Sequence, residues 1–351
     1  MKIAVDAMGG DFAPQAIVEG AVLASKKYGV KVVLVGDEDP VSKELSKYPT
    51  SKLPIYIHHA PHVVAMHDSP SVVVRRMKDT SIKVAFDLAK EGQVNGVVSA
   101  GNSGAAMALA MYIFKKLEGV DRPAIATIHP TMKGSTVLID SGGNVDCKPF
   151  HLVQFAIMGD AYAKYILGKG EPRIGVLSNG EEEGKGNELT REVHDILLKT
   201  DLNYIGYVEG RDLNSGEVDV IACDGFVGNV VLKISEGLWE TISAILKWEA
   251  KDNIRAKVAY FLMKRAMRRL EKRMDYSEYG GAPLLGINGN CVISHGHSNG
   301  KAIMNAILLA SSLAKNKLNE HLTQEIQEKQ DLLRLGQRRP EKTKEPIKSI
   351  H

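Results

Sequence analysis

The sequence has few cysteines, few aromatic residues and no strong excess of charge of one sign. Its three cysteines, Cys147, Cys223 and Cys291, lie far apart and form no CxxC or Cys/His spacing, which argues against a zinc site and for reduced thiols. The formal net charge of +3 over 351 residues is too small to predict nucleic-acid binding. No run of about 18 apolar residues predicts a spanning helix, and the N-terminus does not resemble a signal peptide. We therefore expect a cytoplasmic protein.

Several familiar ligand motifs are also missing. No GxGxxG fingerprint follows the first expected strand, so a dinucleotide site is not indicated. The segments GEEEGKG (180–186) and GHSNGKA (296–302) lack both the spacing and the hydroxyl residue of a Walker loop. GNSGA (101–105) lacks the second glycine of a nucleophile elbow. No HExxH motif or comparable ligand cluster occurs, so we expect neither a metal nor a cofactor.

Short apolar runs alternate with longer helical patterns along most of the chain. Examples are KIAV at 2–5, KVVLVG at 31–36 and STVLID at 135–140. This alternation is typical of βαβ units around a mainly parallel sheet. The predicted fold is therefore α/β and Rossmann-like, a single domain over 1–333 with helices on both faces of the sheet. The charged, proline-bearing tail at 334–351 is expected to be mobile.

A basic helical insertion at about 238–280 interrupts this alternation. Its apolar residues recur mostly at steps of three and four, with many lysines and arginines between them. Such a segment suits an anionic membrane surface or an acidic protein partner, and equally a dimer contact with a solvated basic face. The candidate contact residues are Ile254, Val258, Phe261, Leu262, Lys264, Arg265 and Arg268.

Six expected strands end in short loops rich in glycine and small polar residues. The loops are DAMGGD (6–11), SAGNSGA (99–105), DSGGN (140–144), SNGEEEGKGN (178–187), CDGFVGN (223–229) and SHGHSN (294–299). Ligands of open α/β sheets bind at the carboxyl ends of the strands, where glycine lets the backbone approach an anion. Turn and helix-cap preferences explain any one loop equally well. Six together indicate one crevice for an anion or another polar ligand.

Five of these loops, followed by GGAPLLGINGN at 280–290, resemble the bacterial phosphate acyltransferase family in sequence and order. The resemblance spans roughly residues 1–330. It implies a dimeric α/β enzyme that converts acyl-acyl carrier protein to acyl phosphate for phospholipid synthesis, without a cofactor. It also implies a fold similar to that of phosphotransacetylases and, more distantly, of isocitrate and isopropylmalate dehydrogenases. A helical hairpin that dimerises and presents a basic tip to a membrane or to the carrier protein fits this family.

The implied reaction is attack of inorganic phosphate on an acyl thioester. Phosphate is already anionic at neutral pH, so it needs positioning more than a strong base, and the thioester oxygen needs hydrogen-bond donors. We expect Lys185 to supply a cation and Asn229 an amide donor. Asp224, like the other strand-end carboxylates, would repel a bound anion, so we expect it to orient donors or to relay a proton. The further candidate substrate-binding residues are Asn102, Ser103, Ser141, Gly142, Gly143, Asn144 and His297.

Other interpretations of these residues stay open. Lys185 is also explained as a solvated lysine beside three glutamates, and the asparagines as helix caps. A soluble phosphotransacetylase acting on short acyl-CoA would use the same chemistry, and a non-catalytic membrane-bound protein could keep the fold. The basic insertion favours acyl carrier protein, because coenzyme A needs no protein-docking face. The expected partners are thus acyl carrier protein, inorganic phosphate, an anionic membrane surface and a second copy of the chain.

Overall fold

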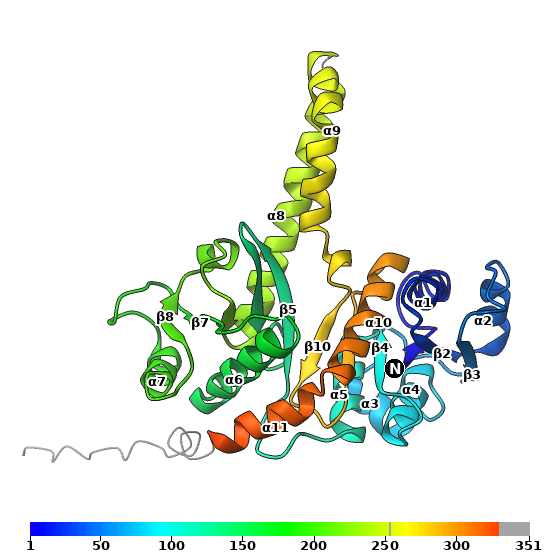
Figure 1. The fold of residues 1–351 in the computed structure, drawn as a ribbon, viewed down its shortest axis with the longest axis horizontal. Helices are drawn as coiled ribbons and strands as arrows, with labels where there is room; N and C mark the ends of the chain where they lie inside the picture. Colours follow the sequence, from blue (N-terminus) through cyan, green and yellow to red (C-terminus); the bar gives the residue numbers. More distant parts are fainter. Residues whose placement is uncertain (253, 330–351) are drawn as a thin grey trace, which may run out of the picture.

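The computed structural model describes residues 1–252 and 254–329 and contains one 11-stranded sheet (Figure 1). The strand order is β3-β2-β1-β4-β11-β10-β5-β6-β9-β7-β8. The strands are β1 Lys2–Asp6, β2 Lys31–Gly36, β3 Ile55–His59, β4 Gly96–Ser99, β5 Ala124–Thr131, β6 Gly134–Ile139, β7 Ile174–Leu177, β8 Tyr204–Val208, β9 Val220–Ala222, β10 Ala282–Leu285 and β11 Cys291–Ile293. The helices are α1 Gln15–Tyr28, α2 Glu38–Leu45, α3 Pro70–Arg76, α4 Ser81–Lys90, α5 Ser103–Ile113, α6 Pro149–Tyr165, α7 Glu188–Leu197, α8 Gly225–Asp252, α9 Ile254–Met274, α10 Gly300–Lys315 and α11 Leu318–Glu328, with short 3-10 turns at Gly210–Asn214 and Tyr276–Glu278.

The sheet separates two apolar layers, as β1 illustrates. Ile3 and Val5 belong to the core that contains α1 and α10, whereas Ala4 belongs to the core that contains α4 and α5. Successive residues of a strand point to opposite faces, so helices cover both sides of β1. A strand buried on both faces reads as a continuous apolar run, which is why KIAV shows no polar alternation. The predicted α/β fold with a mainly parallel sheet is confirmed.

The middle of the sheet reverses the direction of its strands. β10 runs antiparallel to both β11 and β5, and β5 runs antiparallel to β6. Three antiparallel steps therefore make β6, β9 and β7 run opposite to β1, β4 and β11. The six loops therefore follow two oppositely directed sets of parallel strands, and the prediction that they border one crevice stays a prediction.

The register of the central strands nevertheless brings the two sets of strand ends to a similar level. Ile293, which ends β11, pairs with Ala282, and Leu284 two residues later pairs with Ile125 of β5. Ile139, which ends β6, pairs with Ala126, the neighbour of Ile125. The carboxyl ends of the two halves thus approach a common level from opposite directions, with β10 and β5 between them.

A helical hairpin formed by α8 and α9 projects away from the α/β body (Figure 1). It starts at Gly225, inside a strand-end loop, and so begins earlier than the predicted insertion at about 238–280. None of the helices in the described part of the chain is both long enough and apolar enough to cross a lipid bilayer. The predicted tail at 334–351 and the end of the predicted domain beyond 329 lie outside the described residues.

Candidate functional site

All six glycine-bearing loops follow a strand and precede a helix, as predicted. They join β1 to α1, β4 to α5, β6 to α6, β7 to α7, β9 to α8 and β11 to α10. Because the two halves of the sheet run in opposite directions, the loops form two groups. The first group contains 6–11, 99–105 and 294–299, and the second contains 140–144, 178–187 and 223–229.

The loops of the first group pack closely against one another. Gly10 has a left-handed φ of 102° and lies between the carbonyl oxygens of Ala100 and Gly296, where a β-carbon would approach both at 3.1 Å. The Asp11 N–H donates to the Gly296 carbonyl over 2.9 Å, and its Oδ2 lies 2.6 Å from Nδ1 of His297. His297 is therefore held by the first loop of the chain, with Asp11 as a partner that the sequence analysis did not identify.

Asp6 organises the buried side of this first group. Its carboxylate accepts hydrogen bonds from the hydroxyls of Ser81 (2.6 Å) and Ser99 (2.8 Å), and a longer one from the Met8 N–H (3.3 Å). Burial raises the pKa of Asp6, and the hydroxyl and backbone donors only partly oppose this effect. Asp6 is 3% exposed, and its carboxylate binds donors from its own loop and from the neighbouring Ser81 and Ser99.

Asn102 and Ser103 begin α5 with different surroundings. The Asn102 side chain accepts from the Ala105 N–H and caps the helix, and its Nδ2 lies 2.9 to 3.3 Å from the carbonyl oxygens of Ala65, Met66 and Asp68. Its amide is thus engaged with the 65–68 segment in this structure, whereas the sequence analysis assigned it to the substrate. Ser103, at the first position of the helix, is exposed.

A buried carboxylate holds the 140–144 loop of the second group. Asp140 is fully buried and accepts from the N–H groups of Ile125 (2.9 Å), Gly143 (3.0 Å) and Asn144 (2.6 Å), and from Nδ2 of Asn144 (2.8 Å). Burial raises the pKa of Asp140 although these donors favour its charged form. The N–H groups of Gly143 and Asn144 therefore bind an internal carboxylate, whereas the sequence analysis assigned them to a substrate anion. The expectation that strand-end aspartates orient loop amides is confirmed here.

The start of α8 packs directly onto this loop. A β-carbon on Gly228 would overlap the carbonyl oxygen of Asp140, so only glycine permits the approach. One residue later, the Asn229 side chain lies against Gly142, with its Oδ1 at 3.5 Å from the position of a β-carbon there. Two of the predicted site residues, 87 positions apart in the numbering (229 − 142), thus become neighbours.

Ser141 and Asp224 make mainly structural hydrogen bonds in this region. The Ser141 hydroxyl donates to the Ile125 carbonyl (3.0 Å) and therefore accepts from the hydroxyl of Thr127 (2.6 Å), because a serine has a single hydroxyl proton. Thr127 was missed in the sequence analysis, since a threonine within a strand carries no distinctive pattern. The Asp224 carboxylate accepts from the Val227 N–H (2.9 Å) and so caps α8.

Lys185 lies in a different part of the second group. Its side chain passes Gly180, its Nζ is 3.8 Å from Oε2 of Glu182, and it is 47% exposed. Within the described part of the chain, these contacts of Lys185 fall in its own loop and do not join it to Asn229 or Ser141. Its predicted role as a phosphate cation stays a prediction.

Helix α5 connects the two groups of loops. The methyl group of Met107 lies 3.1 Å from the position of a β-carbon on Gly143, so α5 packs against the 140–144 loop. Ser103 and Met107 are four residues apart and share one face of the helix. Ser103, in the exposed first turn of α5, therefore lies one helical turn before the residue that contacts the 140–144 loop.

Two of the thiols in this region are poor nucleophiles. Burial raises the pKa of the Cys223 thiol well above its ordinary value, and the nearby charges of Asp224 and Asp140 add to this. Burial and the charge of Asp140 raise the pKa of Cys147 to about 11. Because the thiolate is the reactive form, neither cysteine suits covalent catalysis at neutral pH.

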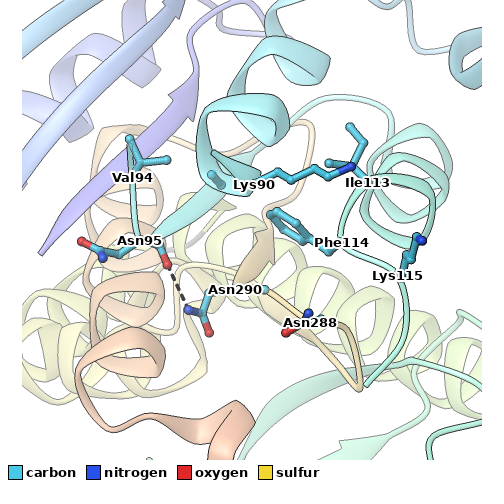
Figure 2. A pocket seen from close by; sticks show the side chains of 10 residues that line it. Lys90, Val94, Asn95, Ile113, Phe114, Lys115, Asn288 and Asn290 are labelled. Carbon is cyan, nitrogen blue, oxygen red and sulfur yellow. Dashed lines mark hydrogen bonds between the residues drawn. The ribbon is translucent and has the colours of Figure 1, made fainter. Parts of the chain in front are cut away.

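A large cavity of about 920 Å³ lies between β5, α8 and the 294–299 loop. A second hollow of about 360 Å³ lies at the amino ends of β4 and β11, opposite to the loops described above (Figure 2). There the Asn290 side chain donates to the Asn95 carbonyl over 2.9 Å and ties together the starts of the two strands. No group of three or more metal-ligating side chains was found within 1–252 and 254–329.

Residues 1–321 match the family model described as "Fatty acid synthesis protein". The chain is 57% identical to the phosphate acyltransferase of Geotalea uraniireducens over 93% of this chain and 95% of that protein. It is 56% identical to the phosphate acyltransferase of Syntrophotalea carbinolica over 99% and 97%. The chain belongs to the phosphate acyltransferase family. The resemblance seen in the strand-end loops is thereby confirmed, and the family is one of enzymes.

Solved structures show the same fold at low sequence identity. A phosphotransacetylase from Streptococcus pyogenes superposes with a TM-score of 0.60 at 17% identity, covering 89% of this chain and 94% of that one. The EutD phosphotransacetylase from Staphylococcus aureus gives a TM-score of 0.56 at 16% identity, over 90% and 94%. The predicted similarity to the phosphotransacetylase fold is confirmed.

The predicted contact residues of the hairpin lie on α9. Phe261 and Leu262 are 71% and 76% exposed, Val258 is 55% exposed, and Lys264 and Arg265 are exposed as well. The side chains of Ile254 and Arg268 lie outside the described residues. Large apolar side chains that protrude into solvent on a projecting helix are unusual for a free surface and indicate a contact.

Proposed function

We propose that the chain transfers a fatty acyl group from acyl-acyl carrier protein to inorganic phosphate, giving acyl phosphate and a free pantetheine thiol. The observation that carries the proposal is the near-full-length identity of 57% to a protein named phosphate acyltransferase. The donor thioester is the finer part of the proposal. It is supported by the basic residues of α9, such as Lys257, Lys264 and Arg265, which suit an acidic carrier protein.

We place the phosphate between the first turn of α5 and the 140–144 loop. Ser103 offers an exposed hydroxyl at a helix N-terminus, and Gly142 with the adjacent Asn229 offers amide groups from the other side. Asp140 keeps the loop in shape by binding its other N–H groups. Lys185 would reach this position when phosphate draws it away from Glu182, with which it pairs loosely.

In this arrangement the bound phosphate itself attacks the thioester carbonyl carbon. An oxygen–carbon bond forms, the carbon–sulfur bond breaks, and the thiolate leaves with the electron pair and then takes a proton. The acceleration comes from positioning the two reactants and from donors to the oxyanion. Direct attack agrees with the raised pKa of Cys223, which disfavours an acyl-enzyme on that thiol.

The test is to supply phosphate with either palmitoyl-acyl carrier protein or acetyl-CoA and to measure acyl phosphate as its hydroxamate. We expect turnover with the carrier-protein thioester to exceed that with acetyl-CoA. A clear preference for acetyl-CoA would instead support a phosphotransacetylase, and no acyl phosphate from either thioester would contradict the enzymatic proposal.

The site assignment is tested separately with Asn229→Ala and Lys185→Ala. Each loss of a donor to a developing charge should lower kcat about 10²-fold, without changing the unfolding transition. Lys199→Ala, an exposed lysine just after α7, is the matched control and should keep the wild-type rate. Wild-type kcat in Asn229→Ala or Lys185→Ala would remove that residue from the site.

We further propose that the chain forms a homodimer through α8. Phe226, Val230, Ile234 and Leu238 recur at steps of four on one face of the helix and are 42% to 63% exposed. Ile234→Glu should shift the sedimentation of the protein toward that of a monomer. Tyr28→Glu, on an equally exposed side chain of α1, should leave it unchanged. A monomeric wild type would contradict the dimer.

We also propose that the outer part of α9 contacts an anionic membrane peripherally. Exposed Phe261 and Leu262 would enter the interface, and the neighbouring Lys264 and Arg265 would meet lipid phosphates. Phe261→Glu should weaken binding to phosphatidylglycerol vesicles, whereas Met132→Glu, which alters an equally exposed residue of the β5–β6 turn, should not. Unchanged vesicle binding of Phe261→Glu would assign α9 to a protein partner instead.

A further inference from the structure

The cavity beside α8 is elongated along that helix. Six of the residues that line it are Ile128, Pro130, Leu232, Trp239, Ala244 and Met274. Its volume of about 920 Å³ lies within the usual range for small-molecule sites. From Leu232 to Ala244 the helix rises about 18 Å, so the cavity offers an extended wall.

The charges around this cavity disfavour an anionic ligand. Glu236 and Glu240 of α8 line the cavity, as does Asp275, which follows α9. Lys301, which also lines it, is paired with Asp275 at 3.0 Å and with Glu278 at 2.7 Å. A neutral, elongated and largely apolar ligand meets no such penalty, because it needs no compensating cation.

One end of the cavity reaches the candidate site. Thr127, part of its lining, makes the 2.6 Å hydrogen bond to Ser141 at the start of the 140–144 loop. His297, part of its lining as well, belongs to the 294–299 loop. α8 itself leaves the site at Gly225 and runs away from it along the cavity. An elongated ligand whose reactive end lies at the candidate site could therefore extend directly along α8.

Most of the cavity lining lies on a different face of α8 from the exposed apolar stripe of Phe226, Val230, Ile234 and Leu238, and only Ala244, at the far end, is aligned with Phe226. Trp239, in the cavity, is five residues from Ile234, in the stripe, which places the two about 140° apart around the helix. A second copy of the chain seated on the stripe would leave the cavity face available. The occupant of the cavity is thus argued independently of the dimer.

We infer that this cavity binds the acyl chain of the thioester substrate, with the carbonyl carbon at the Ser141 end and the terminal methyl group toward Ala244. The inference rests on the proposed acyl transfer and adds the part of the enzyme that selects chain length. Burying one more methylene group contributes about fourfold in affinity, so kcat/KM should rise with chain length until the cavity is filled.

The first experiment closes the far end of the cavity. Ala244→Trp should lower kcat/KM for palmitoyl-acyl carrier protein at least about tenfold, because several methylene groups lose their apolar wall. The value for octanoyl-acyl carrier protein should stay within about threefold of wild type, which also shows that the variant is folded. Ala244→Ser is the matched control and should keep the wild-type profile. An equal change for both chains, or none, would overturn the inference.

The second experiment needs no acyl transfer. Trp248→Phe leaves Trp239 as the single tryptophan, since the sequence has two. Titration with the uncharged probes 1-hexadecanol and 1-octanol should change Trp239 fluorescence, with much tighter binding of 1-hexadecanol, and Ala244→Phe/Trp248→Phe should bind 1-hexadecanol no better than 1-octanol. A chain-length-dependent signal in an inactive protein would retain the cavity assignment while refuting the proposed function. Absence of any change in Trp239 fluorescence in an active enzyme would refute the cavity assignment and retain the proposed function.

Discussion

Two buried aspartates at strand ends, Asp6 and Asp140, hold the two halves of the site in different ways. Asp6 ends β1, Asp140 follows β6, and burial raises the pKa of both carboxyl groups. Asp6 receives its two shortest hydrogen bonds from serine hydroxyls, whereas all four donors to Asp140 are N–H groups. The two aspartates thus have chemically different hydrogen-bonding environments. We call the donors around each carboxylate the Asp6 socket and the Asp140 socket.

The difference lies in what each socket tolerates. A hydroxyl can rotate and either donate or accept, so the Asp6 socket can satisfy an ionised carboxylate, a carboxylic acid or an amide. Backbone and amide N–H groups only donate, so the Asp140 socket needs four acceptor positions and therefore an ionised carboxylate. Replacing the carboxylate by an amide should therefore cost more at Asp140 than at Asp6, although both side chains are almost completely buried.

The largest expected effect is that of Asp140→Asn. The new NH₂ group would face an N–H donor and leave at least one buried donor without an acceptor, at a cost of about 3 kcal/mol in the free energy of unfolding. Turnover should fall too, because the loop that places Gly142 beside Asn229 loses its anchor. Urea unfolding and the hydroxamate assay measure the two effects.

Asp224→Asn is the control for this prediction. Asp224 follows β9 by two residues in the same half of the sheet, but it caps α8 with one bond from Val227, a role that asparagine performs equally well. Its free energy of unfolding should change by less than about 0.5 kcal/mol. Equal losses in the two variants would show that strand-end position, and not the type of donor, decides the cost.

The location of these sockets was predictable from sequence, because it depends on local chemistry. Each strand ends in a buried apolar run, and the glycine, asparagine, serine and aspartate that follow favour turns and helix caps. The six loops were therefore found at the correct junctions. The Asp140 socket was predictable as well, since an aspartate that binds the N–H groups three and four residues later is a local pattern.

The arrangement of the loops was not predictable in the same way. It depends on β10 and β5, which pair across about 160 residues and reverse the strand direction. The sequence GGAPLLGINGN supported the family resemblance, but nothing in it shows that Leu284 pairs with Ile125. The hydroxyl partners of Asp6 are equally remote, since Ser81 and Ser99 lie 75 and 93 residues away.

Asp6→Asn should have a smaller effect than Asp140→Asn. The hydroxyl of Ser81 or Ser99 can turn to accept from the new amide, so the loss reflects mainly weaker, uncharged hydrogen bonds, about 1 kcal/mol in the free energy of unfolding. Urea unfolding at neutral pH measures it. Asp6→Leu should cost clearly more than Asp6→Asn, because it leaves both hydroxyls without the carboxylate. A loss of about 3 kcal/mol in Asp6→Asn would show that the socket is as strict as that of Asp140.

The smallest effect is a pH dependence that tests the raised pKa of Asp6. In the unfolded state the carboxyl group has its ordinary pKa of 3.8, and in the folded state its pKa is higher. As pH rises, the unfolded state therefore releases this proton at a lower pH than the folded state does. The stability of the wild type relative to Asp6→Asn should therefore be greatest below this value and fall as pH rises through the pKa of the folded state. Urea unfolding of both proteins between about pH 4 and pH 7 measures the difference.

Asp219→Asn provides a control of opposite sign for this pH dependence. Burial raises the pKa of Asp219, but hydrogen bonds from Arg173 and Lys169 outweigh it and hold the pKa below its ordinary value. The wild-type advantage over Asp219→Asn should therefore be present above that value and disappear as pH falls below it. If the stability of the wild type relative to Asp6→Asn also increased with pH, the serine hydroxyls would be stabilising the charged carboxylate more than burial destabilises it. The Asp6 and Asp140 sockets would then differ in how well they tolerate an amide, but both would favour the charged carboxylate.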